Sequence, residues 1–497
     1  MCSIASGEPT PITSTVQLFI DDYLVETTEG IRRTVHQWQK HPDNPVMRAD
    51  KPWESGGKSI FTYGSVIYDQ QEDIFKAWYF SRYKEEGKRH SEHFMCYSTS
   101  VDGIHWEKPN VGLYEFQGSK DNNIVLGGHM EGFGGKPHTF GAIKTPWDPD
   151  PDRLYKACFY DSPPGVGYQS PEDGARSATS PDGIHWTTSG AVIMPTMGDT
   201  IGFFYDSIHD RYVCFAKRYT DWGRSRFQCE SEDFVNWTEP RLIMETDDED
   251  DHPCDLYSNT GFVWGDMLLG WLQVFYDHQD PYKSRLVLEL MHSRDGENWS
   301  RMPNRETVLD VGPDGSFDRT NQAPATGTPI VVGDRMYMYY SGRTDYHARN
   351  QVPFQWDSVK VDWSGEHYVG NQRLVNGNIG LGTLRLDGFV SMDANPLGGV
   401  LTTKPLLITP GQPEGVPIRL HVNVKSDWGH CQVELLDEAG NPIPGYTKDD
   451  ADDIVADTVD TVVTWHGEGD ISELVRQPVR LRFHLQNAPL YSFRMSP

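Results

Sequence analysis

Five carboxylates that stand within or just before strand-like runs are the residues of this sequence best suited to chemistry. They are Glu54, Asp199 and Asp255, together with Asp22 and Asp318. Cleavage of a glycosidic bond needs two carboxyl groups across the bond, one protonated as the acid and one ionised as base or nucleophile. We predict that Glu54, Asp199 and Asp255 form this catalytic set, with Asp22 and Asp318 as supporting or alternative members.

Aromatic, basic and histidine side chains at corresponding positions are candidates for substrate contact. Aromatic faces suit the C–H faces of a sugar ring, whereas Arg side chains can bind hydroxyl, sulfate or uronate groups. The predicted substrate-binding residues are Trp53, Tyr257, His138, His347, Arg218 and Arg343. Taken singly, each carboxylate could instead belong to a surface loop or to a salt bridge between structural units. Only their joint placement favours an enzyme.

The elements that would position these residues are marked by a repeated turn. Four segments share a Ser-x-Asp pattern that ends in Trp, and they begin at Ser100, Ser180, Ser231 and Ser293, with a degenerate fifth copy at Leu386. Asp can accept hydrogen bonds from the next backbone N–H groups, Gly tolerates positive φ, and Trp can pack beside a hairpin. We therefore interpret these turns as structural.

Upstream of each turn lie two further strand-like runs, and a fourth strand follows, so the pattern forms five sets of four strands. Five such units in tandem predict an all-β chain that opens with a five-bladed β-propeller over residues 1–389. A large two-sheet sandwich is the alternative, but it would not need five matching turns. In a propeller the starts of the innermost strands meet at one mouth of a central funnel, where the candidate residues would gather.

After residue 389 the pattern changes to runs that alternate apolar with polar side chains, such as 418–424 and 479–485. Alternation of this kind is typical of half-exposed antiparallel strands. We predict a β-sandwich domain over residues 390–497. The boundary follows the fifth set closely, which predicts that the two domains pack together.

Composition and charge exclude several classes. The 497 residues carry a formal charge of -28, which disfavours nucleic acid, and no apolar stretch is long enough for a membrane helix. The first residues do not resemble a signal peptide, so the chain as given is cytoplasmic, or periplasmic or secreted if a leader has been removed. The seven scattered cysteines indicate small buried side chains. We expect no required cofactor; the acidic runs 247–251 and 449–453 are read as solvated loops, with structural calcium as the alternative.

Several stretches resemble a known group of proteins. LFIDDYLVE, RRTVHQ, KHPDNPV, STSVDGIHWEKPNVG and RLDGFVS are similar to bacterial proteins related to glycoside hydrolase families 32 and 43, over about residues 17–497. This resemblance implies a five-bladed propeller glycosidase, often followed by a β-sandwich, with two or three carboxylates at the funnel mouth. The family 32 patterns N-D-P-N-G and R-D-P are missing, which argues against fructan chemistry. In the related family 117 a histidine replaces one acid, which keeps His138 and His347 as candidates.

Together these features predict an exo-acting glycoside hydrolase for fragments of plant or algal polysaccharides. A lyase or a phosphorylase on the same scaffold is the alternative, and a phosphate cluster would have to use Lys217, Arg218 and Arg343. A carbohydrate-binding propeller without catalysis is the non-enzymatic alternative. The expected partner is an oligosaccharide or polysaccharide, and the oligomeric state is left open.

Overall fold

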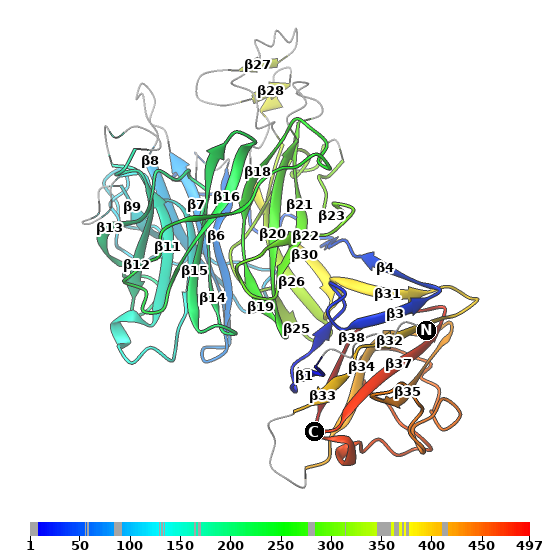
Figure 1. The fold of residues 1–497 in the computed structure, drawn as a ribbon. Helices are drawn as coiled ribbons and strands as arrows, with labels where there is room; N and C mark the ends of the chain where they lie inside the picture. Colours follow the sequence, from blue (N-terminus) through cyan, green and yellow to red (C-terminus); the bar gives the residue numbers. More distant parts are fainter. Residues whose placement is uncertain are drawn as a thin grey trace.

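The fold is all-β, as predicted, in a computed structural model of the chain (Figure 1). It describes residues 8–54, 56, 59–83, 92–128, 130, 133, 135–163, 166, 170–276, 284–313, 315–344, 359–361, 367–369, 372–373, 377–409 and 416–497. Strands dominate these residues, and short 3-10 helices occur at Pro151–Arg153 and Ser472–Leu474.

Three four-stranded antiparallel sheets follow one another along the chain, and each contains strands in sequence order. We call them strand groups one to three. Group one contains β6 (Ile60–Asp69), β7 (Ile74–Tyr83), β8 (Glu92–Ser100) and β9 (Ile124–Gly127). Group two contains β10 (His138–Lys144), β11 (Tyr155–Asp161), β12 (Gly174–Ser180) and β13 (Thr187–Pro195). Group three contains β14 (Gly202–Asp206), β15 (Arg211–Thr220), β16 (Gly223–Ser231) and β17 (Arg241–Met244).

Groups four and five share one eleven-stranded sheet, joined by a parallel pair between Leu286 and Asn321. Group four contains β18 (Cys254–Asn259), β19 (Phe262–Trp264), β20 (Met267–Tyr276), β21 (Arg285–Ser293), β22 (Ser300–Arg301) and β23 (Thr307–Leu309). Group five contains β24 (Asn321–Pro324), β25 (Ile330–Val332), β26 (Arg335–Arg343), β30 (Asn378–Arg385) and β5 (Gln39–Lys40). The outermost strand of group five, β5, therefore comes from the beginning of the chain. A small separate sheet contains β27 (Val359–Val361), β28 (His367–Val369) and β29 (Gln372–Arg373).

Neighbouring groups contact one another in a closed cycle. Strand β6 contacts β10, β10 contacts β14, β14 contacts β19, β20 contacts β24, and β24 contacts β6. Side chains link the first strands directly: Thr62 Oγ1 donates to Ala323 O at 2.6 Å, and Ser65 Oγ accepts from Ala142 N at 2.7 Å. The last group thus returns to the first.

The Asp side chains accept the turn hydrogen bonds that the repeated sequence predicted. In the second copy, Asp182 Oδ1 accepts from the N–H groups of Ile184 and His185, both at 2.8 Å. Gly183 has a φ of 77°, and the third copy places Phe234 at a φ of 63° in the equivalent position.

Each turn also docks on the group before it. Trp78 Nε1 of group one donates to Gly183 O at 2.6 Å, and Gln228 Nε2 of group three donates to Gly296 O at 2.8 Å. The turn of group one receives its bond from group five, where Tyr339 Oη donates to Gly103 O at 2.6 Å. The turns therefore follow the same cycle as the strands.

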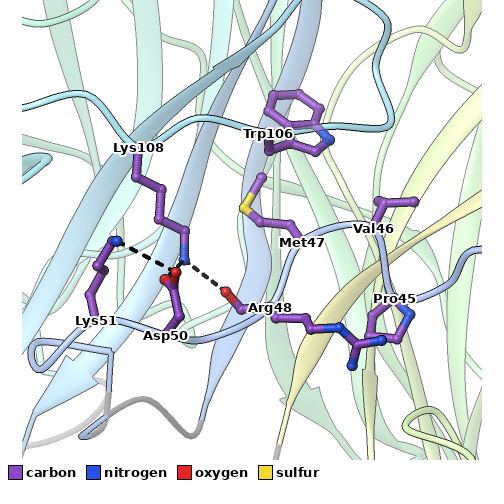
Figure 2. A pocket seen from close by; sticks show the side chains of 8 residues that line it. All are labelled: Pro45, Val46, Met47, Arg48, Asp50, Lys51, Trp106 and Lys108. Atoms are coloured by element: carbon purple, nitrogen blue, oxygen red, sulfur yellow. Dashed lines mark hydrogen bonds and ion pairs between the residues drawn. The ribbon is translucent and has the colours of Figure 1, made fainter.

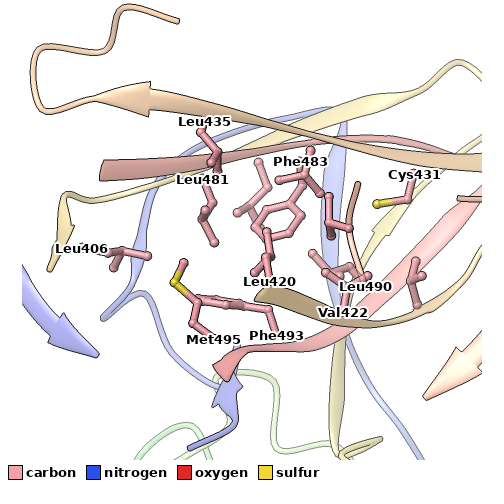
Figure 3. Packing of buried hydrophobic residues seen from close by; sticks show 14 of the residues in the cluster. Leu406, Leu420, Val422, Cys431, Leu435, Leu481, Phe483, Leu490, Phe493 and Met495 are labelled. Atoms are coloured by element: carbon pink, nitrogen blue, oxygen red, sulfur yellow. The ribbon is translucent and has the colours of Figure 1, made fainter. Parts of the chain in front are cut away.

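Two six-stranded sheets enclose the second large core. One contains β1 (Thr10–Ile12), β33 (Leu406–Ile408), β37 (Pro478–Gln486), β32 (Gly399–Thr403), β3 (Val25–Glu29) and β35 (His430–Asp437). The other contains β36 (Asp457–Val462), β34 (Arg419–Lys425), β38 (Ala488–Ser496), β31 (Val390–Ala394), β4 (Ile31–Val35) and β2 (Gln17–Leu18). Figure 3 shows Leu420, Leu481, Phe483 and Phe493 from both sheets meeting in this core.

The pairing of the N-terminal strands crosses the predicted boundary between residues 1–389 and 390–497. Strands β1 to β4 pair with strands that lie after residue 389, and in Figure 1 the N-terminal segment lies among the C-terminal strands. The physical reason is that open sheet edges need partners, and β1, β3 and β4 pair with β33, β32 and β31.

A shared apolar cluster joins the strand groups to the last two sheets. It includes Leu18, Trp264, Trp271 and Phe389, which are all buried. Asp387 lies at this junction, where its carboxylate accepts from Trp264 Nε1 at 2.8 Å and from Ser492 Oγ at 2.7 Å. The two parts therefore pack on each other.

The described residues include six of the seven cysteines and the acidic run 247–251. Cys96, Cys158 and Cys214 are buried and unbridged, as predicted. In the run 247–251, Asp250 is buried against Arg301 at 2.6 Å while the other four residues are exposed. Within the described ranges, no helix is long and apolar enough to cross a membrane, and no group of three or more His, Cys, Asp or Glu residues is placed to hold a metal ion.

Candidate functional site

One cluster of charged and aromatic side chains gathers where the first strands of groups two, three and four begin. Asp199 precedes β14, His138 opens β10, and Asp255 and Tyr257 lie in β18. The cycle of contacts described above brings these strand ends together, although their residues are far apart in sequence. We call this set the Asp199 cluster.

Asp199 is held by a lysine from the same group. Lys217 Nζ lies 2.6 Å from Asp199 Oδ1, and the Asp199 side chain remains 36% exposed. The Lys217 ammonium also lies 4.3 Å from the centroid of the Tyr257 ring. This contact is a cation–π interaction, and it fixes the position of the Asp199 carboxylate relative to Tyr257.

Asp255 is arranged in a similar way. Its carboxylate binds the Arg224 guanidinium and accepts from the Arg224 N–H at 2.7 Å, and its side chain is 20% exposed. The Arg224 guanidinium lies 5.4 Å from the Tyr257 ring centroid. Two partly exposed carboxylates therefore each bind a cation that packs on the same aromatic ring.

The absence of a side chain at residue 223 leaves room for the Asp255 carboxylate beside Arg224. Gly223 has a φ of 93°, and a Cβ atom at this position would come within 2.5 Å of Asp255 Oδ1. A side chain at residue 223 would therefore collide with the carboxylate, which explains a glycine beside Arg224.

His138 lies on the side of the Asp199 cluster that faces group one. Its Nδ1 donates to the Asp199 carbonyl oxygen at 2.9 Å, and its ring lies 5.0 Å from that of Tyr63. Burial lowers the pKa of His138 below its usual value, and the nearby Asp199 charge opposes this shift only in part. The imidazole is therefore neutral at pH 7, with Nε2 as a hydrogen-bond acceptor.

Tyr63, Arg343 and His93 extend the cluster. Burial raises the pKa values of both Tyr63 and Tyr257, and the positive charge of Arg343 acts on both rings in the opposite direction. Burial and the neighbouring His138 lower the pKa of His93 to about 3. The cluster thus combines phenols, neutral imidazoles and two ion-paired carboxylates.

A buried arginine lies beneath the cluster. Arg226 is fully buried, and its Nε donates to Asn259 Oδ1 at 2.6 Å. Its Nη1 donates to Thr200 Oγ1 and to Tyr257 O, both at 3.1 Å. Arg226 therefore ties the residue after Asp199 to the strand that carries Asp255.

Glu54 does not lie at the Asp199 cluster. Glu54 is fully buried, and its carboxylate accepts from Tyr79 Oη at 2.6 Å and pairs with Lys108 at 2.8 Å. Both of its oxygens are bonded, because the N–H groups of Asp50 and Lys51 also donate to Oε2 at 2.8 and 3.0 Å. A carboxylate in this position suits a structural role.

Asp318 and Asp22 also lie in other surroundings. The Asp318 side chain is 3% exposed and pairs with Lys40 at 2.7 Å, which attaches β5 to group five. The Asp22 side chain is 76% exposed and pairs with Arg33 at 2.5 Å, and its carbonyl accepts from Lys404 beside the last two sheets.

The predicted substrate contacts divide in the same way. Tyr257, His138 and Arg343 lie at the cluster, whereas Arg218 is exposed and Trp53 donates to Asn123 Oδ1 at 2.9 Å beside Phe116. His347 lies outside the described residues. Lys217 and Arg218 are neighbours in β15, and strand alternation sends them to opposite faces. Of the three cations that would bind phosphate, Lys217 and Arg343 therefore lie at the cluster, whereas Arg218 faces away from it.

Arg224, Tyr63, His93 and Arg226 were not predicted from the sequence. Arg224 and Arg226 lie in β16, a third strand, whereas the predicted residues lie at the starts of first strands and the ends of second strands. Long cationic side chains can reach the site from a neighbouring strand. The spacing of Arg224 and Arg226 could have indicated them, because residues two positions apart in a strand lie on the same face of the sheet.

The chain was compared with known proteins. No family model and no curated protein matches it. Among solved structures, it shares 15% identity and a TM-score of 0.41 with an N-acetylgalactosamine deacetylase from F. plautii, solved with blood group B trisaccharide, covering 73% of this chain and 97% of that one.

Two further structures have similar scores. A glycosyl hydrolase from Bacteroides ovatus has 12% identity and a TM-score of 0.45, covering 71% and 94% of the two chains. The β-1,2-mannobiose phosphorylase from Listeria innocua, solved with β-1,2-mannobiose, has 12% identity and a TM-score of 0.46, covering 72% and 97%. These neighbours are carbohydrate-active enzymes, but likenesses at this level do not assign a reaction to this chain.

Proposed function

We propose that the five strand groups are the blades of a five-bladed β-propeller closed by β5, and that the last two sheets form a β-sandwich completed by β1 to β4. The closed cycle of strand contacts supports this arrangement. So does the docking of the group one turn on Tyr339 of group five. Radial repetition of this kind leaves only short protected sheet edges.

We propose further that the chain is a carbohydrate-active enzyme, a glycoside hydrolase with Asp199 and Asp255 as its carboxylate pair. The observation that supports this pair is their common placement: both are partly exposed, and both bind cations that pack on Tyr257. The other predicted carboxylates are buried in ion pairs or lie beside the last two sheets. Chain ends of plant or algal oligosaccharides remain the proposed substrates.

In this proposal the remaining side chains bind and orient the sugar. Tyr63 is only partly buried, and its ring would offer an aromatic face to the C–H groups of a sugar. Arg343 donates to hydroxyl or acidic groups. The neutral His138 accepts through Nε2, so it suits a hydroxyl contact better than the role of a general acid at pH 7.

Product analysis tests the reaction class. The protein should be incubated with aryl glycosides and with plant and algal oligosaccharides, in the presence and absence of inorganic phosphate. We expect new reducing ends without phosphate and without unsaturated products. Dependence on phosphate would indicate a phosphorylase, an unsaturated product a lyase, and binding without any product a carbohydrate-binding propeller; each of these results would overturn the proposal.

A further inference from the structure

A pocket that shares no residue with the Asp199 cluster lies between the segment before β6 and the turn after β8. Its volume is about 270 Å³, and it is lined by Pro45, Val46, Met47, Arg48, Asp50, Lys51, Trp106 and Lys108 (Figure 2). Pockets for drug-sized ligands usually have about 300–1,000 Å³. This pocket therefore has room for one small ring rather than for an oligosaccharide.

One part of the pocket wall is apolar. Val46, Met47 and Trp106 supply it, and the Trp106 side chain is only half-buried. Tyr339 packs edge-on against Trp106, with ring centroids 5.5 Å apart. A half-buried indole in a pocket wall suits the C–H face of a sugar ring.

The polar part of the wall carries more positive than negative charge. Lys108 is neutralised, because it pairs with Glu54 at 2.8 Å and with Asp50 at 2.7 Å. Lys51 lies 3.4 Å from the same Asp50, whose side chain is 58% exposed. Arg48 has no hydrogen bond or ion pair from its guanidinium to any residue in the described part of the chain, and Figure 2 shows it extending toward Pro45.

The backbone under the pocket is fixed before any ligand arrives. Met47 forms a bridge with Ile379, and the Ala49 N–H donates to Asn378 Oδ1 at 3.0 Å. The N–H groups of Asp50 and Lys51 are held by Glu54, as described above. A fixed frame reduces the entropy that binding must overcome.

We propose that this pocket binds a single acidic sugar residue, with its carboxylate or sulfate group on Arg48. Asp50 would accept hydroxyl groups, and Trp106 would pack against the ring. A guanidinium without a partner among the described residues, in a pocket of a chain with net charge -28, favours an anion over a neutral sugar. The proposal is independent of the proposed hydrolase activity, because the pocket shares no residue with the Asp199 cluster.

Calorimetric titration of the full chain with galacturonate, galactose, galactose 6-sulfate and inorganic sulfate tests the proposal. We expect saturable binding of one or both acidic sugars, at least about tenfold tighter than galactose, since a charge-assisted hydrogen bond is lost with the neutral sugar. The two acidic sugars separate carboxylate from sulfate recognition. Inorganic sulfate should bind more weakly than the sulfated sugar, because it cannot use Trp106.

Two variants locate the site. Arg48→Ala should weaken binding of the acidic sugar by about tenfold. Arg32→Ala, which changes an exposed arginine of β4, should leave it unchanged. Equal affinity for galactose, no saturable binding of either acidic sugar, or an Arg48→Ala variant that binds like Arg32→Ala would each overturn the proposal.

Discussion

Each carboxylate of the proposed pair forms an ion pair with a cation and remains accessible to a substrate. Asp199 and Asp255 keep 36% and 20% of their side chains exposed, so sugar hydroxyls can reach both without unfolding of the site. A sugar that covers these pairs would exclude water and strengthen their electrostatic interactions. The pairing with Lys217 and Arg224 fixes where the charge lies before the substrate binds.

A substitution of Glu54 tests whether this carboxylate is structural rather than catalytic. Glu54→Gln removes the charge that compensates the buried Lys108, so we expect the free energy of unfolding to fall by about 3 kcal/mol. Turnover per folded molecule should stay near normal. Urea unfolding together with kcat measures both quantities, and an unchanged unfolding midpoint with lost turnover would return Glu54 to the catalytic set.

Asp182 provides a pH-dependent test of the turns. Partial burial opposes the shift, but hydrogen bonds from the backbone and side chain of His185 and from Ile184 lower the pKa of Asp182 from 3.8 to about 2. The lower pKa in the folded state means that ionised Asp182 stabilises the fold. This contribution is present above about pH 4 and is lost as the pH falls through about 2.

The corresponding variant is Asp182→Ala. We expect it to lower stability by about 0.5–2 kcal/mol at neutral pH with turnover near normal. The difference in unfolding free energy from the parent chain should shrink between pH 4 and pH 2. A selective loss of activity at unchanged melting temperature, or a difference that grows in acid, would contradict a structural role.

The role of a single residue could be predicted from the sequence where it depends only on neighbouring residues in the chain. The turn aspartates were predicted because Asx geometry depends only on nearby N–H groups. Glu54 could not be separated from Asp199 in this way, since burial by Tyr79 and Lys108 depends on distant strands. Lys217 and Arg218 differ by one position, and only the register of β15 decides which one faces Asp199.

At the scale of elements, the relative position of β14 and β18 sets the distance between the two carboxylates. Arg226 of β16 bonds to Thr200 and to Tyr257 and so acts as a positioning residue for both strands. Its guanidinium reaches both strands at once, which the single ammonium group of lysine cannot do with the same geometry.

Arg226→Lys should therefore lower kcat by about 10², because small displacements of catalytic groups have effects of this size. KM should change little, since the rings proposed to contact the sugar remain. Arg176→Lys, at another buried arginine, is the matched control and should leave kcat near the parental value. If Arg226→Lys lowered only the melting temperature, Arg226 would be structural without a positioning role.

The order of strands within groups one to three could be predicted, because strands that pair within each group are consecutive in sequence. The role of β1 to β5 could not. Their partners lie after residue 377, and short runs such as Gln39–Lys40 carry no pattern that names a partner. Such long-range pairs form where the edge strand of a folded sheet still lacks a hydrogen-bonding partner, and this depends on the whole fold.

At the scale of the whole molecule, the apolar cluster at the junction makes the two parts interdependent. Removing residues 390–497 would expose Trp264, Trp271 and Phe389 and would leave β1 to β4 without partners. We expect the shortened chain to aggregate, as measured by size-exclusion chromatography and light scattering. A monomeric product with the parental melting temperature would contradict the packed junction.

The converse fragment tests the same point. Residues 390–497 alone should not fold, whereas the same residues joined by a flexible linker to residues 8–38 should, because β1 to β4 then complete both sheets. Dispersion of amide proton shifts distinguishes the two results. Folding of residues 390–497 alone would mean that the N-terminal strands are dispensable.

The most direct test of the central proposal is kcat for Asp199→Asn and Asp255→Asn on the substrate identified by product analysis. Removing an acid or base typically lowers the rate by about 10²–10⁴, whereas loss of a binding carboxylate mainly raises KM. We predict that both variants fold normally and lose at least about 10² in kcat, while Asp22→Asn retains parental turnover. If either aspartate variant kept more than about a tenth of parental kcat, that aspartate would not belong to the catalytic pair and the proposed site would be contradicted.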